Sequence, residues 1–132
     1  MPAVVGAHHT ALTVSDVERS AAWYSDLLGL VQVLSGDDDE VSYRVLTHPT
    51  TPCMIGLRQY HAHPDGPFDE FRTGLDHLAF GVADRAQLES WAAELLRRGD
   101  IPFTPIVDTP IGSVIVLRDP DNIQLELWLP SG

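Results

Sequence analysis

The sequence predicts an α+β protein made of two tandem copies of one module, each with a strand, a helix and then three strands. Two observations lead to this prediction. First, at an offset of 68 residues the chain matches itself at seven of the twenty gapless positions from 9 to 28. Second, each copy shows strand-like alternation followed by helix-start and helix-stop residues. The matched pairs are His9/His77, Ala11/Ala79, Val14/Val82, Asp16/Asp84, Trp23/Trp91, Leu27/Leu95 and Leu28/Leu96.

In the first copy, the alternating, β-branched run 10–14 predicts a strand. Ser15 followed three residues later by Glu18 matches a capping box, which predicts a helix that begins there and ends at Gly29. Runs of extended character broken by Gly, Pro and Asp then predict three strands. These are Val31–Leu34, Val41–Leu46 and Cys53–Gln59.

The second copy follows the same order, with a strand at Leu78–Val82 and a helix capped by Asp84 and ended by Gly99. Helical spacing predicts one buried stripe, formed by Leu88, Trp91, Ala92, Leu95 and Leu96. The three strands expected after the helix are Phe103–Val107, Ser113–Leu117 and Ile123–Leu129. We therefore expect a single domain over 1–132, with module one at 5–60, a linker at 61–74 and module two at 75–130.

The charge of the chain argues against two classes of partner. The formal net charge is −11, from 8 basic and 19 acidic side chains, and this balance repels nucleic acids and anionic membranes. The acidic run Asp37–Glu40 reads as a solvated loop, because it lacks the ligand spacing and the glycine turn of a calcium loop. A small-molecule partner is the remaining expectation.

Cysteine content and the N-terminus bear on the compartment. Cys53 is the single cysteine, so neither an intrachain disulfide nor a cysteine zinc cluster can form. The sequence has no basic segment followed by an apolar stretch at its start, and no apolar run of 18 residues. These features predict a cytoplasmic protein.

Strand parity predicts which side chains share a face, because successive side chains alternate across a strand. Leu12 and Val14 should pack beneath the first helix, and the equivalent alternation holds in the second copy. The opposite face then carries three groups of side chains. They are His9, Ala11 and Thr13; His77, Ala79 and Gly81; and Gln124, Glu126 and Trp128.

His9, His77 and Glu126 therefore form a candidate metal site with small neighbours around it. Two His and one carboxylate with vacant positions suit iron(II), manganese or another divalent ion whose open sites take substrate. A single His near a strand start is usually an ordinary polar residue, but two at matching repeat positions beside an inward Glu favour a ligand set. His8 has the wrong parity and is expected at the surface.

Three segments resemble the vicinal-oxygen-chelate superfamily, which joins glyoxalases, bleomycin resistance proteins, extradiol dioxygenases, epimerases and fosfomycin-modifying transferases. They are the opening run His9–Leu30, the segment Gly74–Phe80 and the closing run Asp119–Leu127. The resemblance implies an eight-stranded, open cup-like mixed sheet with the helices outside. It also implies that His9, His77 and Glu126 hold a divalent metal, Fe²⁺ or Mn²⁺ being favoured and Zn²⁺ or Ni²⁺ also compatible. Many members are homodimers, and some build each cup from two chains.

One departure from that pattern narrows the chemistry. Glyoxalase I and related epimerases carry a fourth ligand on the fourth strand, but alignment of the two copies puts Gly56 opposite Glu126. The two-glutamate proton shuttle expected of glyoxalase I is therefore missing. Arg58 shares the parity of Gly56 and is a candidate partner for an anionic substrate, with a surface role as the alternative.

The remaining candidates surround this predicted cavity. Tyr43 and Trp128 are candidate lining residues. His61 and His63, in the linker, are candidate general bases because His titrates near neutrality, although loop histidines are more often simply solvent-exposed.

The sequence leaves two functions open. One is a metal-dependent enzyme (an extradiol-type dioxygenase, lyase or transferase) that binds a substrate through vicinal oxygens. The other is a metal-free protein that sequesters a drug or metabolite, as bleomycin resistance proteins do, and its acidity would suit a cationic drug. Bleomycin resistance proteins typically lack the metal residues, whereas this chain keeps all three, which favours the enzyme.

Overall fold

The computed structural model describes residues 1–62 and 66–132, and the predicted base His63 lies outside the described residues. The chain divides into two compact units, Met1–Asp65 and Gly66–Gly132. Each unit contains one strand, one helix and three further strands, in that order. The predicted fold class, an α+β protein of two repeated βαβββ modules, is confirmed, and the eight strands are divided between two four-stranded mixed sheets.

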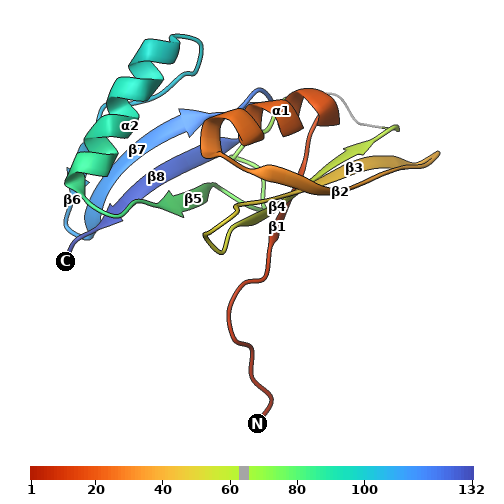
Figure 1. Cartoon of the computed structure of the whole chain (residues 1–132), viewed down its shortest axis with the longest axis horizontal. Helices are drawn as coiled ribbons and strands as arrows, with labels where there is room; N and C mark the ends of the chain where they lie inside the picture. Colours follow the sequence, from red (N-terminus) through yellow and green to blue (C-terminus); the bar gives the residue numbers. More distant parts are fainter. Residues whose placement is uncertain (63–65) are drawn as a thin grey trace. The chain divides into compact units, whose positions relative to one another are not determined.

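The first unit has the sheet order β1-β4-β3-β2, with β1 parallel to β4 and the other neighbours antiparallel. Helix α1 packs on β3 and β4 and covers one face of this sheet (Figure 1). The elements are β1 (Thr10–Thr13), α1 (Val17–Leu28), β2 (Val31–Asp37), β3 (Val41–Thr47) and β4 (Met54–Tyr60).

The ends of α1 follow from short-range hydrogen bonds. Asp16, not the predicted Ser15, is the N-cap, and its carboxylate accepts from the backbone N–H of Arg19 at 3.0 Å. The helix ends at Gly29, whose φ of 68° is the left-handed conformation that lacks a steric cost only for glycine. Tyr24 on this helix is completely buried against the sheet, as is Leu57 on β4.

The second unit repeats the arrangement, with the sheet order β5-β8-β7-β6 and a parallel β5–β8 pair. Helix α2 packs on β7 and β8. Asp84 caps its first turn and Gly99 ends it, as predicted. The elements are β5 (Leu78–Gly81), α2 (Arg85–Arg98), β6 (Val107–Thr109), β7 (Gly112–Arg118) and β8 (Gln124–Pro130).

Two predictions for the second unit are wrong. The strand expected at Phe103–Val107 begins only at Val107, and Phe103 makes an isolated bridge to Leu117. Two prolines explain the difference, because Pro102 directly precedes this stretch, Pro105 lies within it, and neither has the N–H that a regular ladder needs. Leu96 was expected in the buried stripe but is 74% exposed, because α2 buries a narrower face centred on Leu88 and Leu95.

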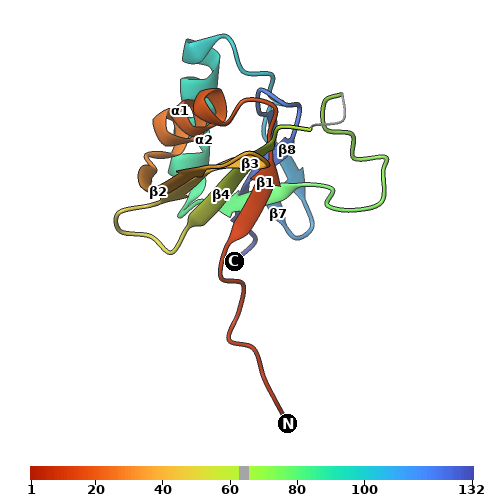
Figure 2. The same ribbon diagram turned by 90° about the vertical axis from the view of Figure 1, so that its right-hand side faces the viewer.

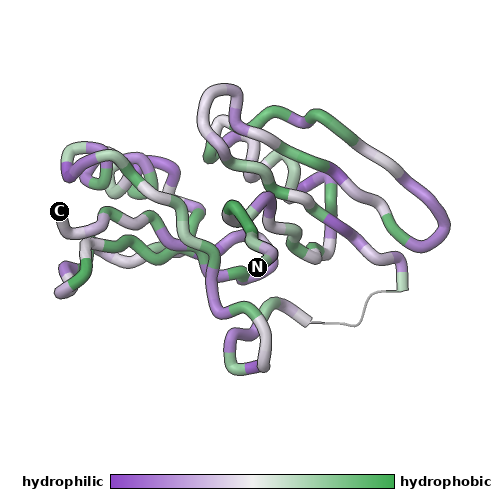
Figure 3. The backbone as a smooth tube through the Cα atoms, turned by 90° about the horizontal axis from the view of Figure 1, so that it is seen from below, coloured by the Kyte–Doolittle hydropathy of each residue, from purple (hydrophilic) through white to green (hydrophobic). Residues whose placement is uncertain are grey.

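The hairpin of β2 and β3 ends in the acidic run Asp37–Glu40, and its tip is hydrophilic in Figure 3. The Asp38 carboxylate accepts from the backbone N–H groups of Glu40 and Val41, both at 2.8 Å. These hydrogen bonds hold the pKa of Asp38 below its ordinary value. The run is thus an exposed turn held by its own hydrogen bonds, as its composition predicts.

The N-terminal residues run away from the first sheet without pairing to it (Figure 2). Met1, Val4 and Val5 in this segment are almost fully exposed. Within the parts that the structure describes, neither helix is long and apolar enough to cross a membrane.

A pair of adjacent leucines tests the observed face of α2. Leu95→Ala should cost about 2–5 kcal/mol of unfolding free energy, because it removes a completely buried side chain. Leu96→Ala should change that free energy by only about 0.5 kcal/mol. Equilibrium urea unfolding of both variants measures the difference. Equal losses would mean that α2 buries the wider stripe after all.

Candidate functional site

The face of the second sheet opposite α2 carries Glu126. Parallel pairing of β5 with β8 sets Ala79 beside Glu126 and Gly81 beside Trp128. The flanking Leu125 is 1% exposed, because it points to the helix side. The Glu126 side chain keeps 13% exposure on the other face. Small residues on β5 thus leave room beside a carboxylate that is largely withdrawn from solvent.

His77, one residue before β5, brings an imidazole to this carboxylate. Its Nε2 lies 3.3 Å from Oε2 of Glu126, and its Nδ1 lies 2.8 Å from Oδ1 of Asp76. The two ring nitrogens therefore face two different carboxylates. The imidazole is held in one orientation by a residue that is its immediate neighbour in the chain.

This orientation decides what His77 offers to Glu126. A carboxylate oxygen accepts hydrogen bonds, so the proton shared with Asp76 belongs to Nδ1 of His77. A neutral ring in this tautomer turns an electron pair toward Glu126. Two electron-pair donors 3.3 Å apart repel each other unless a cation, either a second proton or a metal ion, bridges them. The residues therefore fit a divalent metal, since a His whose other N–H is bound to a carboxylate is the usual form of a histidine ligand.

A chain of polar contacts fixes Asp76 in turn. Asp76 accepts from Nε2 of Gln124 at 3.3 Å, and Oε1 of Gln124 accepts from Nη2 of Arg118 at 2.8 Å. Arg118 also donates to both carboxylate oxygens of Glu70, at 2.8 and 3.1 Å. Because Arg118 only donates, the Gln124 amide must turn its oxygen to Arg118 and its N–H₂ to Asp76.

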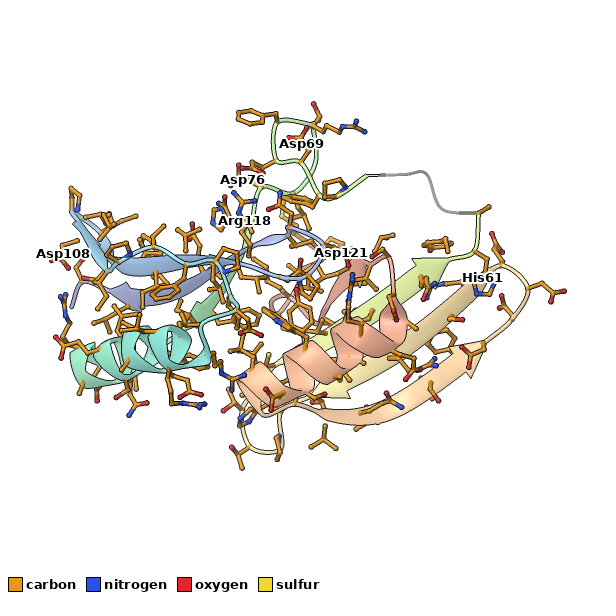
Figure 4. All side chains as sticks on the ribbon, turned by 90° about the horizontal axis from the view of Figure 1, so that it is seen from above. His61, Asp69, Asp76, Asp108, Arg118 and Asp121 are labelled. Carbon is orange, nitrogen blue, oxygen red and sulfur yellow. The ribbon has the colours of Figure 1, made fainter. Side chains whose placement is uncertain are left out.

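Further hydrogen bonds anchor the segment 66–74 to the turn between β7 and β8. The Phe68 N–H donates to the Asp121 carbonyl at 2.8 Å, and the Asn122 side chain donates to the Phe68 carbonyl at 3.0 Å. Figure 4 shows Asp76 and Arg118 close together at the base of the loop that carries Asp69. The part of the linker next to His77 is thus tied to the strand that carries Glu126.

In the first unit the equivalent position is Gly56. Parallel pairing sets Ala11 of β1 beside Gly56 and Thr13 beside Arg58, as Ala79 and Gly81 are set in the second unit. The structure therefore confirms that Gly56 is the counterpart of Glu126. A Cβ at this position would meet Ala11 at ordinary contact distance, so glycine is not required there by space.

Arg58 lies on the same face as Gly56, between two tyrosines. Its guanidinium carbon is 5.7 Å from the ring centre of Tyr43 and 5.5 Å from that of Tyr60. Its Nε donates to the Tyr60 hydroxyl at 3.0 Å. Trp128, the other predicted lining residue, is the second unit's counterpart of Arg58 and is partly exposed.

The predicted histidines occupy three different settings. His9 is an exposed residue of the first unit, directly before β1, and its Nδ1 lies 2.9 Å from that of His8. His61 directly follows β4 (Figure 4), and its ring nitrogens contact Ser42 at 3.0 Å and the Asp39 carbonyl of the β2–β3 turn at 3.1 Å. Within residues 1–62 and 66–132, no three His, Cys, Asp or Glu side chains are gathered in a way that could hold a metal ion. The structure pairs two of the three predicted ligands, His77 and Glu126.

Sequence reasoning missed Asp76, Gln124, Arg118 and Glu70 as the support of this pair. One signal was available, because strand parity puts Gln124 on the face of Glu126. The adjacency of Asp76 and His77 gave no comparable indication, since neighbouring side chains on an extended chain normally point apart.

Comparison with known proteins agrees with the fold. The family model described as the Glyoxalase/Bleomycin resistance protein/Dioxygenase superfamily matches residues 6–127. The uncharacterized protein YwkD of Bacillus subtilis (strain 168) is 31% identical over 125 residues, which cover 92% of this chain and 94% of YwkD.

Solved structures give the same result. A glyoxylase/bleomycin resistance protein/dioxygenase domain from Frankia sp. EAN1pec is similar, with a TM-score of 0.88 and 34% identity, over 98% of this chain and all of that one. A variant of the fosfomycin resistance protein FosX from Listeria monocytogenes is similar in fold, with a TM-score of 0.71 and 15% identity, over 98% and 93% of the two chains. That FosX structure is a complex with Mn(II) and 1S,2S-dihydroxypropylphosphonic acid.

The Glu70–Arg118 ion pair should stabilise the fold at neutral pH and lose this contribution in acid. The Arg118 guanidinium lowers the pKa of Glu70 from 4.5 to about 2. A carboxylate whose pKa is lower in the folded state stabilises the fold above its unfolded value, and this contribution is lost as pH falls. Glu70→Gln should therefore lower the thermal unfolding midpoint at neutral pH, and the difference from wild type should shrink between about pH 4.5 and about pH 2.

Thermal unfolding followed by circular dichroism across that pH range measures this effect. Asp100→Asn, which changes an exposed carboxylate after α2, is the matched control and should show no such convergence. A Glu70→Gln difference that stays constant with pH would contradict the proposed role of the ion pair.

Proposed function

Since the chain belongs to the Glyoxalase/Bleomycin resistance protein/Dioxygenase superfamily, we propose that it is a metal-dependent enzyme that acts on a small molecule bearing two neighbouring oxygen atoms. The observation that carries the proposal is the His77–Glu126 pair, in which Asp76 turns the free electron pair of the imidazole toward a carboxylate 3.3 Å away. This arrangement needs a cation, and a divalent metal suits one nitrogen and one oxygen donor.

His77 and Glu126 would hold the metal, and His9, the counterpart of His77 in the first copy, is the predicted third ligand. When bound, the metal would act as a Lewis acid that polarises the oxygens of the substrate. Iron(II) and manganese(II) are favoured by a two-His, one-carboxylate set, with zinc and nickel as further candidates. The relative FosX contains Mn(II) in one structure, and we extend that choice of metal to this chain as part of the proposal.

The residues around His77 and Glu126 would orient the metal ligands and line the space for the substrate. Asp76 holds the Nδ1 proton of His77 and so keeps the Nε2 electron pair available. Trp128, two residues after Glu126 on the same face, offers a flat apolar surface beside the carboxylate. The burial of Glu126 strengthens the electrostatic interactions that it makes, because water screens them less.

The reaction class follows in part from what the first unit lacks. Gly56 stands where a second inward carboxylate would be, so a proton shuttle between two glutamates is not available. This disfavours glyoxalase I chemistry and leaves an extradiol-type oxygenase, a lyase or a transferase. A ligand set of only three side chains leaves positions for the vicinal oxygens of a substrate and, in an oxygenase, for dioxygen.

Metal content is the first test. Tag-free wild-type protein should carry, or take up on dialysis, about one equivalent of iron, manganese, zinc or nickel by elemental analysis. His77→Ala and Glu126→Ala should abolish this, whereas His61→Ala, whose imidazole contacts Ser42 and the Asp39 carbonyl in the first unit, should retain it. If the metal is iron, the next measurement is oxygen consumption in the presence of catechol-type substrates. Wild-type protein that neither carries nor takes up any of these metals would leave the sequestering function in place of the enzyme.

Asp76→Asn tests the support of the metal site separately. An asparagine keeps the size of the side chain but loses the charge that fixes the His77 ring, so metal affinity should fall about 10–100-fold. Competition with a chromogenic chelator measures this affinity. Asp108→Asn removes a carboxylate that pairs with Arg85 elsewhere in the unit and should leave the affinity unchanged. An Asp76→Asn protein with wild-type metal affinity would exclude this role.

A further inference from the structure

Arg58 has no carboxylate partner in the parts of the chain that the structure describes, and its guanidinium is packed against aromatic rings instead. The chain has 19 acidic residues and 8 basic ones. Arg44, Arg85 and Arg118 each form an ion pair with a carboxylate. Arg58 instead has an aromatic ring on each of two sides and one hydrogen bond, to a neutral hydroxyl.

The geometry points to a binding subsite, and we propose that Arg58, with Tyr43 and Tyr60, binds the carboxylate of a small molecule on the open face of the first sheet. The proposal depends on the first unit alone and does not require a metal. Nε of Arg58 is occupied by Tyr60, but the two Nη groups are the part of the guanidinium that forms a parallel pair of hydrogen bonds with a carboxylate.

The two tyrosines have complementary roles in this subsite. The Tyr60 hydroxyl accepts from Arg58, so its own proton remains available to donate to the same anion. The Tyr43 ring lies across from Arg58 on β3 and limits where the guanidinium can move. It has room because its neighbour on β2 is Gly36, where a Cβ would overlap the ring.

The surrounding sheet keeps the approach to Arg58 open. The residue beside it on β1 is Thr13, which is exposed, and Gly56 lies two positions earlier on β4. Arg58 itself is half-buried, so the charge is partly desolvated and its hydrogen bonds to an anion are stronger than at a free surface. Arg58 also contributes to lowering the pKa of Asp38, although less than the backbone hydrogen bonds that this carboxylate accepts from Val41 and Glu40.

A single positive charge favours a carboxylate over a phosphate or phosphonate. Proteins usually meet a doubly charged oxyanion with several cations or with a helix N-terminus, and here one guanidinium faces the ligand in a chain with a net charge of −11. One cation and one hydroxyl donor match a monoanion with two oxygens. The second unit gives an internal contrast, because Trp128 holds the position equivalent to Arg58.

Benzoate is the probe for the test, with neutral benzamide as its uncharged counterpart. Binding is followed by NMR, through the Nε–H signal of Arg58 and the backbone amides of β4. Benzoate should shift these signals saturably and benzamide should not. Arg58→Gln should weaken benzoate binding about tenfold or more, and Tyr60→Phe about threefold. Arg58→Lys, which keeps the charge but not the paired Nη donors, should bind with intermediate affinity and guards against a folding defect.

Two controls separate this proposal from the metal site. Arg72→Gln, which removes another exposed arginine without a described ion pair, should leave benzoate binding unchanged. His77→Ala should bind benzoate as wild type does, even if metal is lost. Binding that survives in a folded Arg58→Gln protein, or that disappears in His77→Ala, would overturn the proposal. Inorganic phosphate that displaces benzoate at lower concentration would overturn the choice of a carboxylate.

Discussion

In each module, the parallel pairing of the first strand with the last one determines which side chains of these two strands share the face opposite the helix. It sets Ala11 beside Gly56 in one unit and Ala79 beside Glu126 in the other. Side chains alternate with a period of two, so a slip by one residue would turn Glu126 toward α2 and bring Leu125 to the open face. Burying Leu125 under the helix opposes that slip. The apolar alternation of the last strand therefore fixes the carboxylate as firmly as it fixes the core.

The pairing alone does not orient His77, which precedes its strand by one residue. That task falls to Asp76, and the carboxylate of Asp76 is held by Gln124, from the same strand as Glu126. Arg118 completes the network by donating hydrogen bonds to both Gln124 and Glu70. One polar network thus supports the two proposed ligands of the second unit. The same network includes Glu70, so it also holds the linker segment before His77 against the second sheet.

Periodic features could be predicted from the sequence, and local contacts between unrelated positions could not. The repeat, the caps at Asp84 and Gly99 and the face of Glu126 all follow from spacing, because helices and strands impose fixed periods. Leu96 fits the helical spacing but is exposed, since the width of the buried face depends on what the sheet offers. The contacts of Arg118 with Glu70 join residues 48 apart, and no period in the sequence records such a pair.

The two copies have diverged at the same register positions, and in opposite ways. The position that carries the carboxylate Glu126 in the second unit is Gly56 in the first, and the position that carries the cation Arg58 in the first unit is Trp128 in the second. A duplicated module offers each position twice, so one copy can carry a carboxylate where the other has none. Glycine at position 56 also means that no acid stands two residues from Arg58 on the same face, where it could neutralise the guanidinium. A guanidinium without a carboxylate partner in the described parts of so acidic a chain is therefore consistent with glycine at position 56, and both features agree with the anionic ligand proposed for the first sheet.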